Sequence, residues 1–172
     1  MKKEEIYLAG GCFWGVEHFF SLIKGVVDTQ AGYANGHTEN PSYEQVSKND
    51  TGHAETVHVV YDADTVSIEK ILLLFFEIID PTSLNKQGHD VGTQYRTGIY
   101  YINIDDLPTI NNLINQLSVK YDKPIVVEVC ELGVFYSAED YHQKYLVKNP
   151  DGYCHINPAM FKLAKNAQCE FY

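Results

Sequence analysis

The sequence predicts a single α/β (α+β) domain, a two-layer sandwich of helices on a mixed sheet with a ferredoxin-like core. Short apolar strand patterns alternate with helical patterns in a β-α-β, β-α-β-α-β order. The chain has 172 residues, of which 45% are hydrophobic, and this is enough for one substantial core. We therefore expect one domain over residues 1–172, with an irregular C-terminal segment over residues 148–172.

The expected elements follow from local periodicity. A strand over residues 6–9 precedes a helix beginning at Phe13, and Glu17 is placed on the polar side of that helix. A loop follows over residues 32–41, and a longer polar loop over residues 81–96 is of a length that is often functional. Further strands are expected over 26–31, 55–61, 97–102 and 125–130, and further helices over 42–46, 67–79, 105–121 and 137–147.

The charge balance excludes some classes of partner. Asp and Glu number 23 against 13 Lys and Arg, giving a net charge of −10, which argues against binding to nucleic acid phosphates. No apolar run has the length needed to cross a bilayer, so no membrane partner is expected. The N-terminal residues lack the apolar core of a signal peptide, and a cytoplasmic location is therefore expected.

The four cysteines, at positions 12, 130, 154 and 169, have no spacing typical of a zinc site. Structural disulfides are not expected in a cytoplasmic protein. The seven histidines are scattered as well, so neither a metal site nor a cofactor is expected.

Cys12 lies on a glycine turn between the first strand and the first helix, in the stretch Gly10–Gly15. Unpaired backbone N–H groups and the dipole of a helix N-terminus stabilise a thiolate, and glycines let the backbone bring the sulfur to the surface. This location favours a nucleophile, while a buried, inert thiol is the alternative that spacing alone leaves open. The 13 tyrosines suggest an amphipathic aromatic pocket or groove.

The stretch Gly-Cys-Phe-Trp-Gly resembles the signature of the peptide methionine sulfoxide reductases of the A type. Three further blocks resemble motifs of the same family and follow in family order, at residues 51–55, 92–96 and 138–146. The resemblance implies the same sandwich fold, with the C-terminal segment wrapped over the site. It also implies reduction of the S-epimer of methionine sulfoxide, free or in proteins. The implied partners are oxidised proteins or free methionine sulfoxide, and thioredoxin or a similar dithiol reductant.

The resemblance also implies roles for several side chains. From the sequence alone, Glu55 would be interpreted as a solvated surface carboxylate. The resemblance instead implies that Glu55 is the family's catalytic carboxylate. Burial among aromatic residues would raise its pKa and keep it protonated as an acid. Tyr43 and Tyr95 carry over as phenol donors to the sulfoxide oxygen, although half-buried packing is their ordinary role. Asp90 carries over as a support of this network, or is an ordinary loop aspartate.

Phe13 and Trp14 are candidates for an aromatic wall around the methyl group of the substrate. The alternative is that both begin the core face of the helix. Trp14 does not lie on the apolar face of that helix, and this favours a role for Trp14 in the substrate pocket.

The resemblance implies that Cys12 becomes a sulfenic acid that Cys154 resolves to a disulfide. Cys169 either takes over that disulfide in a second exchange or is an inert thiol of the tail. Cys130 ends an apolar strand and is most simply a core residue.

Two other functions compete with this one. The first is a cysteine-dependent hydrolase or acyltransferase, with His53 or His142 as the base for Cys12. The second is a non-enzymatic peptide-binding module whose tyrosines line a groove.

Overall fold

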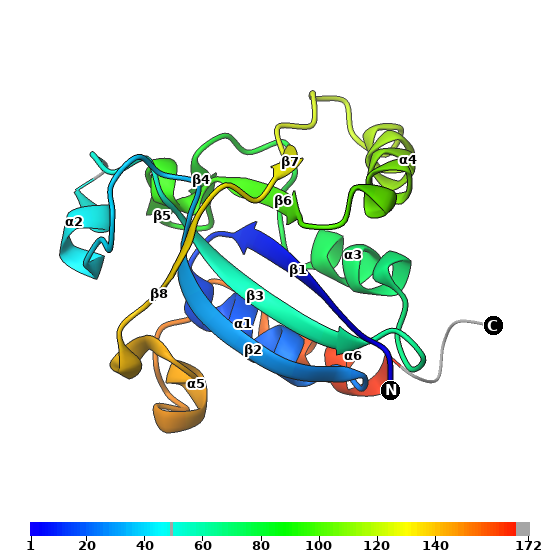
Figure 1. Ribbon diagram of the computed structural model, residues 1–172, viewed down its shortest axis with the longest axis horizontal. Helices are drawn as coiled ribbons and strands as arrows, with labels where there is room; N and C mark the ends of the chain where they lie inside the picture. Colours follow the sequence, from blue (N-terminus) through cyan, green and yellow to red (C-terminus); the bar gives the residue numbers. More distant parts are fainter. Residues whose placement is uncertain (49, 168–172) are drawn as a thin grey trace.

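A computed structural model describes residues 1–48 and 50–167 and confirms the two-layer α/β class, with helices against one mixed sheet (Figure 1). In this part of the chain the main sheet has the strand order β7-β6-β1-β3-β2-β8. Its neighbours are antiparallel except β6 and β7, which are parallel. The strands are β1 (Lys3–Gly10), β2 (Val26–Ala34), β3 (Ala54–Asp62), β6 (Thr97–Tyr101), β7 (Glu128–Glu131) and β8 (Phe135–Ser137).

The four central strands have the ferredoxin-like arrangement that the element order predicts. Helix α1 (Phe13–Ser21) connects β1 to β2, and α3 (Ile68–Glu77) with the loop after it connects β3 to β6. The strand order β6-β1-β3-β2 interleaves these two units, so that every central neighbour is antiparallel. The remaining helices are α2 (Tyr43–Ser47), α4 (Leu107–Ser118), α5 (Tyr145–Lys148) and α6 (Pro158–Asn166).

The main core lies between the sheet and the helices. Figure 1 shows α1 and α6 behind β2 and β3, and α3 beside α4. At the end of β1, a Cβ on Gly10 would lie 2.9 Å from Phe75 of α3 and 3.4 Å from Val16 of α1. Gly10, the last residue of β1, therefore lets both helices pack closely against the strand end, two residues before Cys12.

The opposite face of the sheet carries a second, smaller cluster that includes Tyr7 and Tyr100. Leu132, which follows β7, and Phe135, the first residue of β8, pack against this cluster. Because both faces are covered at the centre of the sheet, side chains of the central strands are shielded from water on either side.

The predicted helix over 137–147 is wrong. Ser137 ends β8, a 3₁₀ turn covers Asp140–His142, and Lys144 has a left-handed φ of 52°. Long-range contacts explain the difference, because Gln143 bonds through its side chain to both the N–H and the carbonyl of Ala31 on β2. These tertiary bonds outweigh a helical sequence pattern.

The C-terminal segment is more regular than expected, since it contains α6. The side chain of Asn157 caps this helix by accepting from the N–H of Ala159, and Pro158 occupies its first turn. The helix packs on α1, which provides the apolar partner that its own weak periodicity did not indicate.

The long loop over 81–96 also has structure of its own. It contains a small hairpin of β4 (Lys86–Gln87) and β5 (Asp90–Val91), and then a 3₁₀ turn, Thr93–Tyr95. The side chain of Gln87 holds this hairpin against the segment that follows α3, by bonding both the N–H and the carbonyl of Asp80 at 2.9 Å. Among the described residues, no helix is long and apolar enough to cross a membrane.

Candidate active site

Cys12 is the N-cap residue of α1, as the sequence predicts, and it follows Gly11, whose φ of 90° suits glycine. The expected exposure of its sulfur is wrong, because Cys12 is only 7% exposed. Burial raises its pKa well above the ordinary value, and the charge of Glu55 adds to this, while a backbone hydrogen bond at Trp14 opposes it. The helix N-terminus alone therefore does not hold a thiolate here, since desolvation is the larger effect.

Glu55 lies on β3 with Val57 and Val59, on the face that α1 covers, because alternate residues of a strand share a face. The side chain is 1% exposed. Its Oε1 atom accepts a hydrogen bond of 3.2 Å from the N–H of Phe13, whereas its buried Oε2 atom has no partner. The carboxyl group is thus held directly beside Cys12, with one oxygen free to act on a ligand.

Burial raises the pKa of Glu55 to about 8, with a smaller contribution from the charge of Asp90. The N–H of Phe13 acts in the opposite direction but is the weaker influence. At neutral pH the side chain is therefore mainly the protonated acid. A protonated carboxyl group donates a hydrogen bond and does not repel a developing thiolate on Cys12.

Tyr43 begins α2 and Tyr95 ends the turn before β6, and a hydrogen bond joins their side chains. Burial and the charge of Glu55 raise the pKa of both phenols, so both keep their protons. The charges of Glu55 and Cys12 both act on the pKa of each phenol, which places Tyr43 and Tyr95 around the same site. The arrangement offers two neutral O–H donors near the carboxyl group.

Asp90 lies on β5, and its Oδ2 atom accepts a hydrogen bond of 3.1 Å from the hydroxyl of Tyr153. Its charge also raises the pKa of Cys12, of Glu55 and of Cys154. Asp90 therefore joins the hairpin to the C-terminal segment at the edge of the site.

The two aromatic residues after Cys12 have different surroundings. Phe13 is buried in the main core, 5.7 Å from the ring of Tyr33 between centroids. Trp14 is partly exposed and stacks on Tyr145 with a centroid distance of 3.7 Å. Its indole N–H donates to Nδ1 of His142 at 2.9 Å, which fixes the plane of the ring. Trp14 thus forms a rigid aromatic surface, while the ring of Phe13 lies in the core, 5.1 Å from the ring of His142 between centroids.

The two candidate bases of the hydrolase alternative have no free nitrogen lone pair. Nδ1 of His53 accepts from the N–H of Gly36, and its Nε2 lies 2.8 Å from the carbonyl of Thr38, to which it must donate. Nδ1 of His142 accepts from Trp14, so the neutral ring carries its proton on Nε2, which is buried without a partner. Neither histidine is arranged to take a proton from Cys12.

Comparison with known proteins matches this chain to one family. The model of the family described as peptide methionine sulfoxide reductase matches residues 4–170. The chain belongs to the peptide methionine sulfoxide reductase family. It is similar to the peptide methionine sulfoxide reductase MsrA of Lachnoclostridium phytofermentans, with 60% identity over 96% of this chain and 99% of that protein.

Solved structures of relatives share the fold. Reduced Mxr1 from Saccharomyces cerevisiae matches with a TM-score of 0.86 and 37% identity, over 91% of this chain and 92% of the yeast chain. Mxr1 in complex with Trx2 matches with a TM-score of 0.60 and 25% identity, over 84% of this chain and 85% of the other.

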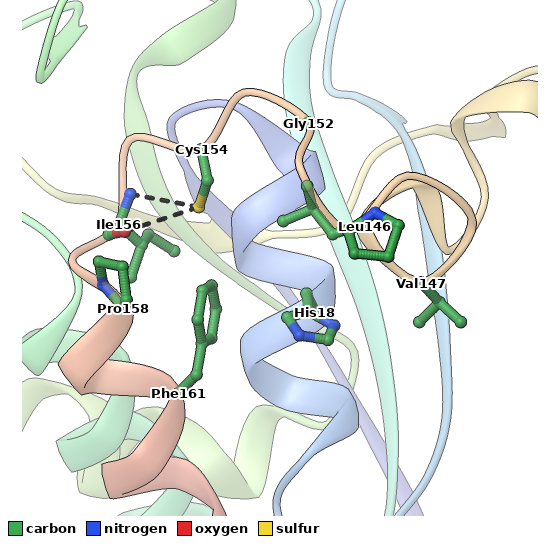
Figure 2. A pocket seen from close by; sticks show the side chains of 9 residues that line it. His18, Leu146, Val147, Gly152, Cys154, Ile156, Pro158 and Phe161 are labelled. Atoms are coloured by element: carbon green, nitrogen blue, oxygen red, sulfur yellow. Dashed lines mark hydrogen bonds between the residues drawn. The ribbon is translucent and has the colours of Figure 1, made fainter.

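In this member of the reductase family, Cys154 lies on the C-terminal segment against α1, close enough for its charge to affect the pKa of Cys12. Its sulfur accepts from the N–H of Ile156 at 3.4 Å. The sulfur lies at the wall of a pocket of about 600 Å³. Figure 2 shows it across this pocket from His18 and Phe161. The other candidate resolving thiol, Cys169, lies outside the described residues.

Cys130 is remote from this constellation. It is half-buried on the opposite face of the sheet, beside the cluster of Tyr7 and Tyr100, and it lies 3.7 Å from the side-chain nitrogen of Asn35. Among residues 1–48 and 50–167, no group of His, Cys, Asp and Glu side chains is arranged to hold a metal ion.

Sequence reasoning missed the residues that support the site. Glu17, placed on a polar helix face, is 2% exposed and accepts hydrogen bonds from Thr29 and from the N–H of Lys144. Glu139 accepts from the hydroxyl of Tyr33 and from the N–H of Tyr43, and so fixes the start of α2. The partners of both carboxylates are distant in sequence or on another element, and no local pattern indicates them.

Proposed function

We propose that this protein reduces the S-epimer of methionine sulfoxide, free or within proteins, to methionine, with Cys12 as nucleophile and Glu55 as acid. The observation that carries the proposal is the buried carboxyl group of Glu55, held beside Cys12 with an unpartnered oxygen and a pKa of about 8. A sulfoxide oxygen needs a proton donor there, because negative charge builds up on it as the S–O bond breaks.

The first step would form a bond between the sulfur of Cys12 and the sulfoxide sulfur while Glu55 gives its proton to the oxygen. The hydroxyls of Tyr43 and Tyr95 would donate to the same oxygen, and Trp14 would pack against the methyl group. Because burial keeps Cys12 protonated in the free enzyme, its thiol proton would leave during attack and pass to the Glu55 carboxylate, which restores the acid. The hydroxyl group would then pass from the substrate sulfur to the sulfur of Cys12 as the substrate S–O bond and the new sulfur–sulfur bond break. Methionine leaves with the electron pair, and Cys12 becomes a sulfenic acid.

The second step would join Cys154 to Cys12. The thiol of Cys154 attacks the sulfur of the sulfenic acid, the S–O bond breaks, and the oxygen leaves as water with the thiol proton. A dithiol reductant then reduces the disulfide by thiol exchange. Yeast Mxr1 has been solved in complex with Trx2, and this supports thioredoxin as the reductant of the present protein.

We also place this cycle in the cytoplasm, where thiols are kept reduced, and cell fractionation tests that location.

Cys12→Ser tests the proposal most directly. An alcohol is a poor nucleophile toward sulfur at its ordinary pKa, so methionine formation from free methionine sulfoxide and dithiothreitol should be abolished. Circular dichroism should show an unchanged fold. Substantial residual activity would contradict the role of Cys12, and equal consumption of both sulfoxide epimers in a chiral assay would contradict the substrate. A hydrolase would form no methionine in this assay.

A further inference from the structure

Each residue of the segment Tyr153–His155 contacts a different part of the surroundings of Cys12. Tyr153 donates to Asp90, and the sulfur of Cys154 lies against the backbone of α1. His155 places its Nε2 atom 3.1 Å from the carbonyl oxygen of Gly10, two residues before the nucleophile. The segment that carries the second thiol is therefore held at three successive positions.

The chemistry of the His155 ring defines which nitrogen is the donor. Nε2 faces a carbonyl oxygen, which can only accept, so Nε2 carries the proton. Nδ1 is buried without a partner and has its lone pair unused. Burial lowers the pKa of His155, while the charge of Asp90 opposes the shift, and the ring is neutral at physiological pH.

The ring occupies a slot that two glycines make possible. A Cβ on Gly11 would stand 3.0 Å from Nε2 of His155, and a Cβ on Gly88 would stand 3.3 Å from the Cβ of His155. Both glycines have positive φ, 90° and 60°, in the turn before Cys12 and in the β4–β5 hairpin. The slot is thus built from the two loops that border the nucleophile.

We propose that His155 is a positioning residue for the resolving step: its hydrogen bond to Gly10 holds Cys154 within reach of the oxidised Cys12. The inference rests on the proposed function and adds a residue that acts on the second step alone. Holding two reacting groups in a restricted arrangement speeds their reaction, because less orientational freedom has to be lost. Glu55, Tyr43 and Tyr95, which act on the sulfoxide, have no hydrogen bond to His155 in the described structure.

Two substitutions separate the hydrogen bond from the volume of the ring. In His155→Gln the side-chain amide nitrogen reaches about as far as Nε2 and still donates to Gly10. In His155→Met a flexible apolar side chain fills the slot without any donor. His58→Met is the matched control, because His58 is also partly buried and hydrogen-bonded, to Glu5, but packs beside Tyr7 on the opposite face of the sheet.

The experiment is a single turnover of each reduced protein with excess free methionine sulfoxide and no reductant. Rapid quenching gives the rate of methionine formation, and peptide mapping gives the rate of Cys12–Cys154 disulfide formation. Dimedone traps the sulfenic acid that persists between the two steps. We expect His155→Met to form methionine at the wild-type rate and the disulfide about tenfold more slowly, with more trapped sulfenic acid, as loss of one hydrogen bond implies. His155→Gln and His58→Met should resolve at close to the wild-type rate.

Equal slowing by Gln and Met would overturn the proposal, because the donor would then be irrelevant. A parallel loss in methionine formation would show a general structural effect and would also overturn it, as would faster resolution in His155→Met. Failure of the proposed function is distinguishable, because the wild-type protein itself would then form no methionine.

Discussion

The sulfur of Cys154 lies against Gly15 of α1, where an added Cβ would stand only 2.8 Å from the sulfur. Glycine inside a helix is unfavourable by about 0.5–1 kcal/mol relative to alanine, so its presence one turn after Cys12 needs a packing reason. The contact with Cys154 supplies that reason. The helix that carries Cys12 thereby leaves room for Cys154, the thiol that we propose reacts with it.

Gly15→Ala should therefore separate helix stability from the resolving step. The added methyl group displaces Cys154, and we expect disulfide formation to slow about tenfold or more while the first methionine still forms. The unfolding free energy should change little, since the gain in helix propensity offsets part of the crowding. Rapid quenching and urea denaturation measure the two effects. Asn112→Ala, on an exposed position of α4, is the control for helix propensity. An unchanged resolution rate in Gly15→Ala would show that the contact has no role.

The sequence predicts those parts of the fold that depend on local patterns. The apolar alternation of β3 and the stripe of Val16, Phe19 and Phe20 on α1 are each visible within about ten residues, and both elements are confirmed. The segment after β8 is different, because Glu139 and Gln143 bond to β2 and to the start of α2. Its path depends on contacts across the fold, and local periodicity predicts the wrong helix.

The same distinction holds for the candidate site. The glycine turn before Cys12 is a local signal, and it places the cysteine correctly at the start of α1. The ionisation states are not local. Glu55 stays protonated, and Cys12 is not a free thiolate, because α1 covers the pleated face of β3 on which Glu55 lies. This burial depends on how the helix and the strands pack together. The alternation of residues along a single strand does not predict that packing.

Glu55→Gln should slow the reductive step by about 10²–10⁴-fold, the range typical for loss of a general acid. The amide keeps the shape of the side chain and can still hydrogen-bond, but it supplies no proton. Single-turnover methionine formation is the measurement, with thiol titration of Cys12 as the control for an intact nucleophile. Unchanged methionine formation would show that Glu55 is not the acid.

The buried carboxyl group also predicts how stability depends on pH. The pKa of Glu55 is about 8 in the folded protein, against an ordinary value of 4.5, so the folded state binds the extra proton between these two values. Stability from this group is therefore fully present below pH 4.5 and is lost as the pH rises toward 8, by up to about 1.4 kcal/mol per pH unit.

Glu55→Gln should remove this dependence, because the amide does not titrate. Urea denaturation at intervals between pH 5 and pH 9, roughly the window of these two pKa values, should show the variant gaining stability relative to the wild type as the pH rises. Identical pH profiles for the two proteins would mean that Glu55 titrates normally. In the wild type, the rate of methionine formation should fall above about pH 8 as the acid loses its proton.

Cys154→Ser tests the order of the two chemical steps. If Cys12 first becomes a sulfenic acid, methionine is released before the second cysteine acts. The variant should therefore form about one methionine per enzyme without reductant and then stop, with Cys12 as a trappable sulfenic acid. Wild-type protein should instead accumulate a Cys12–Cys154 disulfide that thioredoxin reduces.

Cys169 extends the same experiment to the end of the chain. If it takes over the disulfide, wild-type protein with excess sulfoxide and no reductant should form a Cys154–Cys169 disulfide and about two methionines per enzyme, because Cys12 is freed for a second turnover. Cys169→Ser should lower the yield to about one. If Cys169 is inert, the wild type should stop at about one methionine, and Cys169→Ser should not change that yield. A disulfide between Cys12 and Cys130 would contradict the assignment of Cys154, because Cys130 lies on the opposite face of the sheet.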